Sequence, residues 1–197
     1  MRSLVISVGL GALAALVALA ACGDNTAPPL RYTDPGAGKL RLIQGPGVGA
    51  GPQTSVVLQL VVGDAPLTGY SVGFDLPLDD AQVALAGFTA GTALAPGTAP
   101  AAALGTLSST GPLAHQLVTG QSQKASGGGA VPTNTTLAPG TVLYAVQLEL
   151  RKGAAGGVVF DGTAHDFVLR SGGMRDRAGT TVVSASDVAI GKLEANP

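Results

Sequence analysis

A repeated alternation of apolar and polar residues is the feature that most constrains this fold. In LTGYSVGFDL, residues 67–76, the side chains of Tyr70, Val72, Phe74 and Leu76 fall on one side of an extended chain. TSVVLQLVVGD (54–64) and TVLYAVQLELRK (141–152) repeat the pattern, and no sustained helical stripe appears. A period of two between turn residues such as Gly and Asp is typical of strands with one buried face.

Shorter segments of the same kind complete the pattern: KLRLIQ (39–44), GVVFDG (157–162), HDFVLRSGG (165–173) and TTVVSASDVAIGKL (180–193). Residues 39–197 therefore predict an all-β, antiparallel β-sandwich. In the segment 141–152 we expect two faces. The inward face holds Val142, Tyr144, Val146, Leu148 and Leu150, and the outward face holds Gln147, Glu149 and Arg151.

Residues 91–139 have a different composition, rich in Gly, Pro, Ser and Thr. LAHQLVTG (113–120) predicts one strand, and its flanks predict long loops on the sandwich rather than a second domain. Loops beyond about 12–15 residues are usually functional or disordered.

The N-terminus has the features of an export signal. Arg2 is the only charge before Cys22, and the apolar run that follows is at the short end of what spans a bilayer. Leu19-Ala20-Ala21-Cys22 resembles the lipobox of bacterial lipoproteins. The resemblance implies removal of residues 1–21, with cleavage between Ala21 and Cys22 and lipidation of Cys22. An ordinary signal peptide with a chance cysteine, or a free core thiol, is the alternative.

This resemblance implies a cell-envelope protein held to the membrane by the lipid on Cys22, because two or more acyl chains anchor firmly. Gly23 rather than Asp follows the cysteine, which favours the outer membrane if the cell is Gram-negative. Residues 22–38, with two adjacent prolines, predict a flexible tether.

Composition limits the class of partner. Removing residues 1–21 from the 197 leaves 176 residues, which predicts one domain. Ten Lys and Arg face twelve Asp and Glu in that part, and no basic patch is visible. We therefore expect no nucleic-acid partner.

Two longer segments resemble cohesin-like domains over roughly residues 39–192. VVGDAPLTGYSVGFDLPLDDAQVALAGFTAGTAL (61–94) is similar to the opening half of the family. In that half, a strand is followed by a small-residue turn, a second strand that begins with Gly-Tyr, an acidic turn, a hydrophobic strand and a Thr-Ala-Gly segment. The closing half is matched by APGTVLYAVQLELRKGAAGGVVF (138–160) and FVLRSGGMRDRAGTTVVSA (167–185). The matching positions are Gly69-Tyr70, Phe74, Asp79-Asp80, Val83, Leu85 and Thr89-Ala90-Gly91.

The cohesin-like resemblance implies a nine-stranded jelly-roll sandwich that binds a dockerin-like protein, in a fold shared with carbohydrate-binding modules. The family's Asp-Pro in the acidic turn is replaced by Pro77-Leu78-Asp79-Asp80. The positions that contact dockerin form no motif that can be transferred to this chain.

The residues give no catalytic signature. His115 and His165 are the only histidines, and DGTAHD places Asp161, His165 and Asp166 together in what is a polar turn or a weak cation site. Asp79-Asp80 is a solvated turn or part of a calcium site. Ser108-Ser109 and Ser184–Ser186 lack a nucleophile setting. We expect no catalytic residues, no metal site and no cofactor.

A lipid-anchored, non-catalytic module that binds or scaffolds proteins is the function we expect. Gln147, Glu149 and Arg151 form either its partner surface or simply a solvated face, in which case the loops in 91–139 are the other candidate site. The alternatives are a carbohydrate-binding surface lipoprotein, which needs exposed aromatic rings, and an envelope enzyme, which needs a polar pocket. The chain has no Trp, and only Tyr32, Phe88 and Phe160 are unassigned to an inward face.

The anchor can be tested directly. Cys22→Ala removes the sulfur that would take the lipid, so the variant should leave the detergent phase and run as an uncleaved or soluble form. Phase partitioning and intact mass measure this. A variant that still partitions fully into detergent, with an unchanged mass, contradicts the lipoprotein assignment.

Overall fold

Two five-stranded sheets face each other in the structure, a computed structural model that describes residues 29–47, 53–94, 102–123 and 133–196. The first sheet has the order β14 (Val188–Ala189), β2 (Leu40–Gln44), β3 (Ser55–Val62), β10 (Val142–Leu150), β6 (Val83–Ala90). The second has the order β13 (Thr181–Val183), β12 (Ser171–Arg175), β5 (Ser71–Pro77), β8 (Gln116–Ser122), β7 (Ala102–Ser108).

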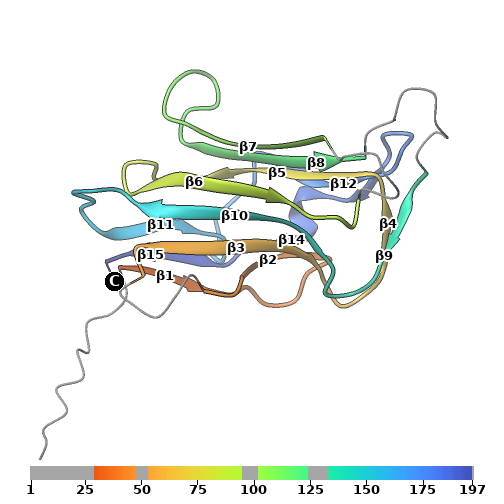
Figure 1. Cartoon of the computed structure of the whole chain (residues 1–197), viewed down its shortest axis with the longest axis horizontal. Helices are drawn as coiled ribbons and strands as arrows, with labels where there is room; N and C mark the ends of the chain where they lie inside the picture. Colours follow the sequence, from red (N-terminus) through yellow and green to blue (C-terminus); the bar gives the residue numbers. More distant parts are fainter. Residues whose placement is uncertain (1–28, 48–52, 95–101, 124–132, 197) are drawn as a thin grey trace, which may run out of the picture.

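Smaller elements close the sandwich. A three-stranded sheet has the order β1 (Leu30–Thr33), β15 (Lys192–Ala195), β11 (Gly157–Asp161), and β4 (Leu67–Gly69) pairs with β9 (Thr135–Leu137). A short 3₁₀ turn, η1, spans Ala185–Asp187. Figure 1 shows the long strands of both sheets running along the long axis of the molecule, with β4 and β9 at one end. All strand pairs are antiparallel except β14 with β2, so the predicted all-β antiparallel sandwich is confirmed.

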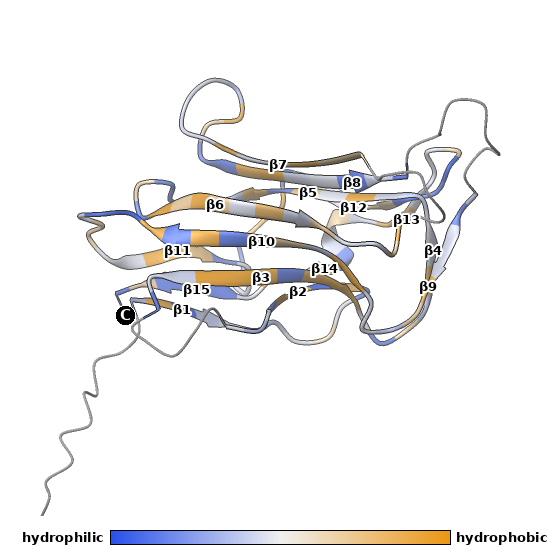
Figure 2. Ribbon diagram, viewed as in Figure 1, coloured by the Kyte–Doolittle hydropathy of each residue, from blue (hydrophilic) through white to orange (hydrophobic). Residues whose placement is uncertain are grey.

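Hydrophobic and hydrophilic residues follow one another along the long strands (Figure 2), and the buried residues form the core between the sheets. On β5, Val72, Phe74 and Leu76 are buried while the residues between them are partly exposed. On β10, the register shifts between Val142 and Tyr144, so Leu143 and Tyr144 are both buried and Val142 is 37% exposed. The inward assignment of Val142 is therefore wrong, because an irregular strand end moves its side chain to the surface.

Tyr144 joins the two sheets at the centre of the core. Its ring centroid lies 6.1 Å from that of Phe74 on the opposite sheet and 5.2 Å from that of Phe88. Its hydroxyl forms a 2.8 Å hydrogen bond with Oγ1 of Thr119 on β8. Burial raises the pKa of the Tyr144 phenol far above its ordinary value, so the ring stays neutral.

A buried glutamine makes a second link between the sheets. Gln121 on β8 is 2% exposed, and its amide donates to the carbonyl oxygen of Gly91 at 2.6 Å and accepts from the Gly91 N–H at 3.1 Å. Gly91 follows β6 in the other sheet, and a Cβ there would lie 2.3 Å from the carbonyl oxygen of Leu143. The Gly91 N–H also donates to the carbonyl oxygen of Leu143 on β10 at 2.8 Å. The side-chain amide of Gln121 therefore adds a link from β8 to the chain that follows β6, and its own polar atoms are satisfied in the core.

The N-terminal boundary of the fold differs from the sequence prediction. Leu30–Thr33, within the expected tether 22–38, form β1 and pair with β15. Leu30 and Tyr32 are buried, and the Tyr32 hydroxyl donates to the carbonyl oxygen of Leu42 at 2.7 Å. The alternation in LRYT is only four residues long, which is why the surrounding turn residues mask it.

Two further expectations are wrong in detail. Residues 102–108, which we expected to be part of a loop, form β7, and the backbone of β7 pairs with that of β8. The segment 165–173 is not one strand, because β12 begins only at Ser171 and Phe167 lies in a turn, half-buried. In neither segment is the alternation of apolar and polar residues long enough to predict strand or loop. Its conformation depends on the strands that lie beside it in the fold.

The signal segment and Cys22 lie outside the described residues. Within the part of the chain that the structure describes, no helix is long and apolar enough to cross a membrane. The cohesin-like identity and the jelly-roll connectivity stay predictions.

The register of β5 can be tested by two substitutions. Phe74 is 1% exposed, so Phe74→Ala should lower the free energy of unfolding by about 3–5 kcal/mol. Ser71 lies on the other face and is partly exposed, so Ser71→Ala should cost well under half of that. Urea unfolding measures both values. Equal losses would mean that the register is displaced by one residue.

Candidate functional site

Three glycines form a row across the outward side of the second sheet. Gly173 on β12 pairs with Gly73 on β5, which pairs with Gly120 on β8. The next position on β7 is Leu104, whose side chain is 56% exposed. We call this row and its edges the glycine trough, because the missing side chains leave the backbone at the bottom of a shallow depression.

The strand geometry requires at least one of these glycines. A Cβ on Gly73 would lie 2.4 Å from the carbonyl oxygen of Thr119 on the neighbouring strand, so no side chain fits there. Gly120 is different, since the nearest heavy atom to a Cβ there is the carbonyl oxygen of Val72 at 3.7 Å, an ordinary contact. The depression at Gly120 is therefore not imposed by local packing.

Two hollows of about 340 and 240 Å³ occupy the trough and meet at Ser71 and Val72. One edge of the trough carries Arg175, whose Nη1 donates to the carbonyl oxygen of Gly179 at 3.0 Å. The opposite edge carries Asp75, whose carboxylate accepts from the Ser171 hydroxyl at 2.8 Å. A cation and an anion thus flank the glycine row. These two charges would orient a polar or charged partner more than they would raise its affinity.

Of the three residues predicted as a partner surface, two lie on the outward face of β10 and the third lies beyond the end of the strand. Gln147 and Glu149 both face outward in the centre of the first sheet, half-buried and exposed respectively. Arg151 lies just beyond the strand. Its Nε donates to the carbonyl oxygens of Asp80 at 2.7 Å and Val83 at 3.0 Å, so Arg151 holds the turn before β6 rather than joining a regular surface.

The candidate polar clusters have structural partners. Asp161 accepts from the backbone N–H and hydroxyl of Thr163, and these hydrogen bonds lower the pKa of its carboxyl. Ser184 and Ser186 are hydrogen-bonded to each other, and Ser184 also donates to Asp187. No group of three metal-ligating side chains occurs in the described residues.

One polar pair was not predicted. The buried carboxylate of Asp80 is hydrogen-bonded to Nδ1 of His115 at 2.5 Å, although the two residues are far apart in the sequence. His115 has a positive φ of 58°, and its side chain is 68% exposed. The backbone N–H of His115 donates to the carbonyl oxygen of Ser108, and the Ser108 hydroxyl donates to the carbonyl oxygen of Thr110. The Asp80–His115 pair fastens the start of β8 to the acidic turn.

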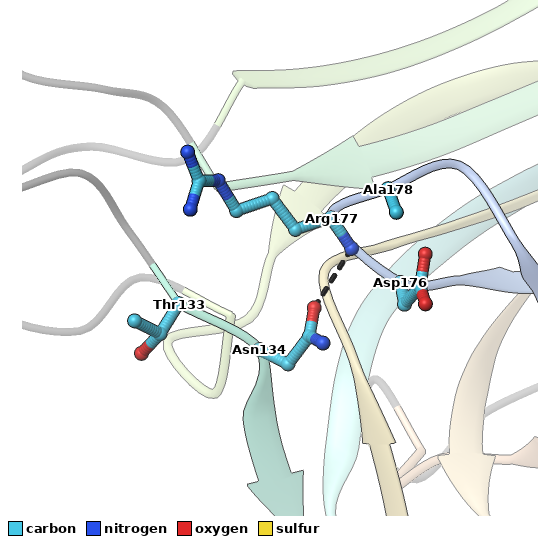
Figure 3. A pocket seen from close by; sticks show the side chains of 5 residues that line it. All are labelled: Thr133, Asn134, Asp176, Arg177 and Ala178. Carbon is cyan, nitrogen blue, oxygen red and sulfur yellow. Dashed lines mark hydrogen bonds between the residues drawn. The ribbon is translucent and has the colours of Figure 1, made fainter.

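A further hollow, of about 470 Å³, lies between the start of β9 and the β12–β13 hairpin (Figure 3). The amide oxygen of Asn134 accepts from the backbone N–H of Arg177 at 2.7 Å. The carboxylate of Asp176 accepts from the N–H of Thr180 and closes the turn. Asn134 and Asp176 therefore bond the backbone of the β12–β13 turn, and the side chains of Thr133 and Arg177 complete the polar lining of the hollow.

No family model, curated protein or solved structure matches this chain. The lipobox and the cohesin-like segments therefore stay resemblances, and function has to be argued from the geometry of the surface.

The role of Arg151 gives a test. Arg151→Ala should lower the free energy of unfolding by about 1–2 kcal/mol, because two carbonyl oxygens lose a charged donor. Lys152→Ala, at an exposed neighbouring position, should change it by less than about 0.5 kcal/mol. Urea midpoints of the two variants measure this. Equal effects would place Arg151 back on a free surface.

Proposed function

We propose that this protein is a lipid-anchored module of the cell envelope that binds a partner protein without catalysis. The observation behind the proposal is the glycine trough, a depression on a sheet face that rests on a rigid, closed core. Gly73 and Gly120 bring the backbone to the surface, where another chain can approach closely. The trough edges offer Ser71, Arg175 and Asp75 for hydrogen bonds and charge contacts.

A protein partner fits this surface better than a polysaccharide. The exposed large hydrophobic residues of the described chain are Leu104, Leu113, Val142, Val158 and Val168, none of them aromatic. Tyr32 and Phe160 are buried, and Phe88 is half-buried against Gly105, where a Cβ would lie 2.5 Å from its ring. Sugar-binding sandwiches often use exposed rings, and the trough supplies backbone and small side chains instead.

The envelope location rests on the lipobox resemblance at Cys22. Because β1 begins at Leu30, seven residues (23–29) separate Cys22 from the folded domain, and the fully extended distance from Cys22 to Leu30 is about 27 Å. An anchored domain would therefore capture partners close to the membrane surface.

The trough can be separated from the β10 surface by a matched pair of substitutions. Gly120→Val fills the trough, and Gly87→Val fills the outward space beside Gln147 on the other sheet, where a Cβ meets nothing closer than 3.8 Å. Both sites tolerate a side chain, and valine suits a strand. A soluble chain from Gly23 onward keeps β1 and serves as bait in an envelope extract.

Gly120→Val should lower capture of a specific partner by about tenfold or more, with the melting temperature nearly unchanged, because the centre of an interface tolerates no misfit. Gly87→Val should leave capture unchanged. The reverse result would move the site to Gln147 and Glu149. Retention on a polysaccharide column with no captured protein would favour the carbohydrate-binding alternative.

A further inference from the structure

Val168 is the most exposed large hydrophobic residue of the described chain, at 73%. It lies between half-buried Phe167 and buried Leu169, in the segment that joins β11 to β12. Hollows of about 250 and 420 Å³ are both lined by Phe167 and Val168, so these two residues form a ridge between them. The two side chains are adjacent and line both hollows, so they form one continuous apolar surface.

The segment that presents this ridge is held rigidly. Asp161 accepts two hydrogen bonds from Thr163, the N–H of Ala164 donates to the carbonyl oxygen of Asp161, and the N–H of Phe167 donates to that of Ala164. After the ridge, the N–H of Arg170 donates to the carbonyl oxygen of Asp75 on β5. Val168 is therefore exposed by a fixed backbone, and a ligand there would order little additional chain.

The larger hollow combines an apolar lining with negative charge. Pro77, Phe160, Ala164, Phe167 and Val168 supply the apolar surface, and Asp161 and Asp166 supply two carboxylates. Hydrogen bonds from Thr163 keep Asp161 ionised by lowering its pKa, and the nearby Lys192 ammonium is itself paired with Glu194 at 2.8 Å. The volume of about 420 Å³ is within the usual range for a binding pocket.

This hollow and the glycine trough are both lined by residues of β5. Gly73, Asp75 and Pro77 are alternate residues of β5 that face outward, and Pro77 lines the hollow. Pro77 lies four positions after Gly73 along the strand, a distance of about 13 Å. A protein seated on the trough would reach the hollow with a side chain.

We propose that the hollow formed by Pro77, Asp161, Asp166, Phe167 and Val168 is a specificity pocket for a lysine or arginine side chain of the partner protein. The aliphatic stem packs on Phe167 and Val168, and the cationic group meets the two carboxylates. That the partner is a protein is taken from the proposed function. The preference of the hollow for a cation is argued only from the residues that line it.

Three small probes test this preference on the full chain in detergent: the N-acetyl, N′-methylamide derivatives of lysine, norleucine and 2-aminoadipate. They share an alkyl stem and end in an ammonium, a methyl and a carboxylate. Titrations followed by methyl and amide NMR should show saturable shifts at Phe167 and Val168 for the lysine probe. The norleucine probe should bind about fivefold more weakly, and the aminoadipate probe should not saturate.

Asp161→Asn with Asp166→Asn should weaken the lysine probe to the level of norleucine, since asparagine keeps an acceptor for Thr163 but removes the charge. Asp64→Asn, at an exposed carboxylate elsewhere, should change nothing. Equal binding of the three probes, no saturation with lysine, or an undiminished response in the double variant would each overturn the proposal. None of these outcomes depends on the Gly120→Val capture experiment, so the two proposals can fail separately.

Discussion

The packing of Tyr144 between the two sheets is the contact on which the rest of the structure depends. Its ring lies against Phe74 and Phe88, and its hydroxyl is satisfied by Thr119. A buried phenol without a partner would cost free energy, so this hydrogen bond fixes where β10 meets β8. The leucines and valines of the inward faces then fill the remaining space, and the faces opposite them are left for solvent or a partner.

A core closed in this way allows the surface to carry glycine. Gly73 and Gly120 add no side chain to stabilise their strands, and glycine weakens a strand interior. The buried neighbours Phe74 and Thr119 hold those strands in place, so the outward row remains open. The trough and the hollow beside the Phe167–Val168 ridge are both lined by residues of β5, and under our proposals both contact the partner protein.

The candidate site was less accessible to sequence reasoning than the fold. The outward positions of Gln147 and Glu149 could be predicted because a long, regular strand defines its own two faces, and their role as a partner surface stays a prediction. The hydrogen bonds of Arg151 to Asp80 and Val83 could not be predicted, because only the folded chain brings these residues near. The trough could not be predicted, because Gly73, Gly120 and Gly173 are far apart in the sequence. A glycine in one strand does not indicate which residues of other strands lie beside it.

The sequence by itself determined the strand periodicity, the face of Phe74 and the all-β class, because alternation along one strand is a local property. The tertiary structure alone decided strand order, the inclusion of Leu30–Thr33 in a sheet and the pairing of Asp80 with His115. It also decided that β7 exists, since small residues such as Ala102 and Gly105 become a strand only when β8 supplies hydrogen bonds. Contacts between distant segments depend on the whole chain packing together, and no short stretch of sequence encodes them.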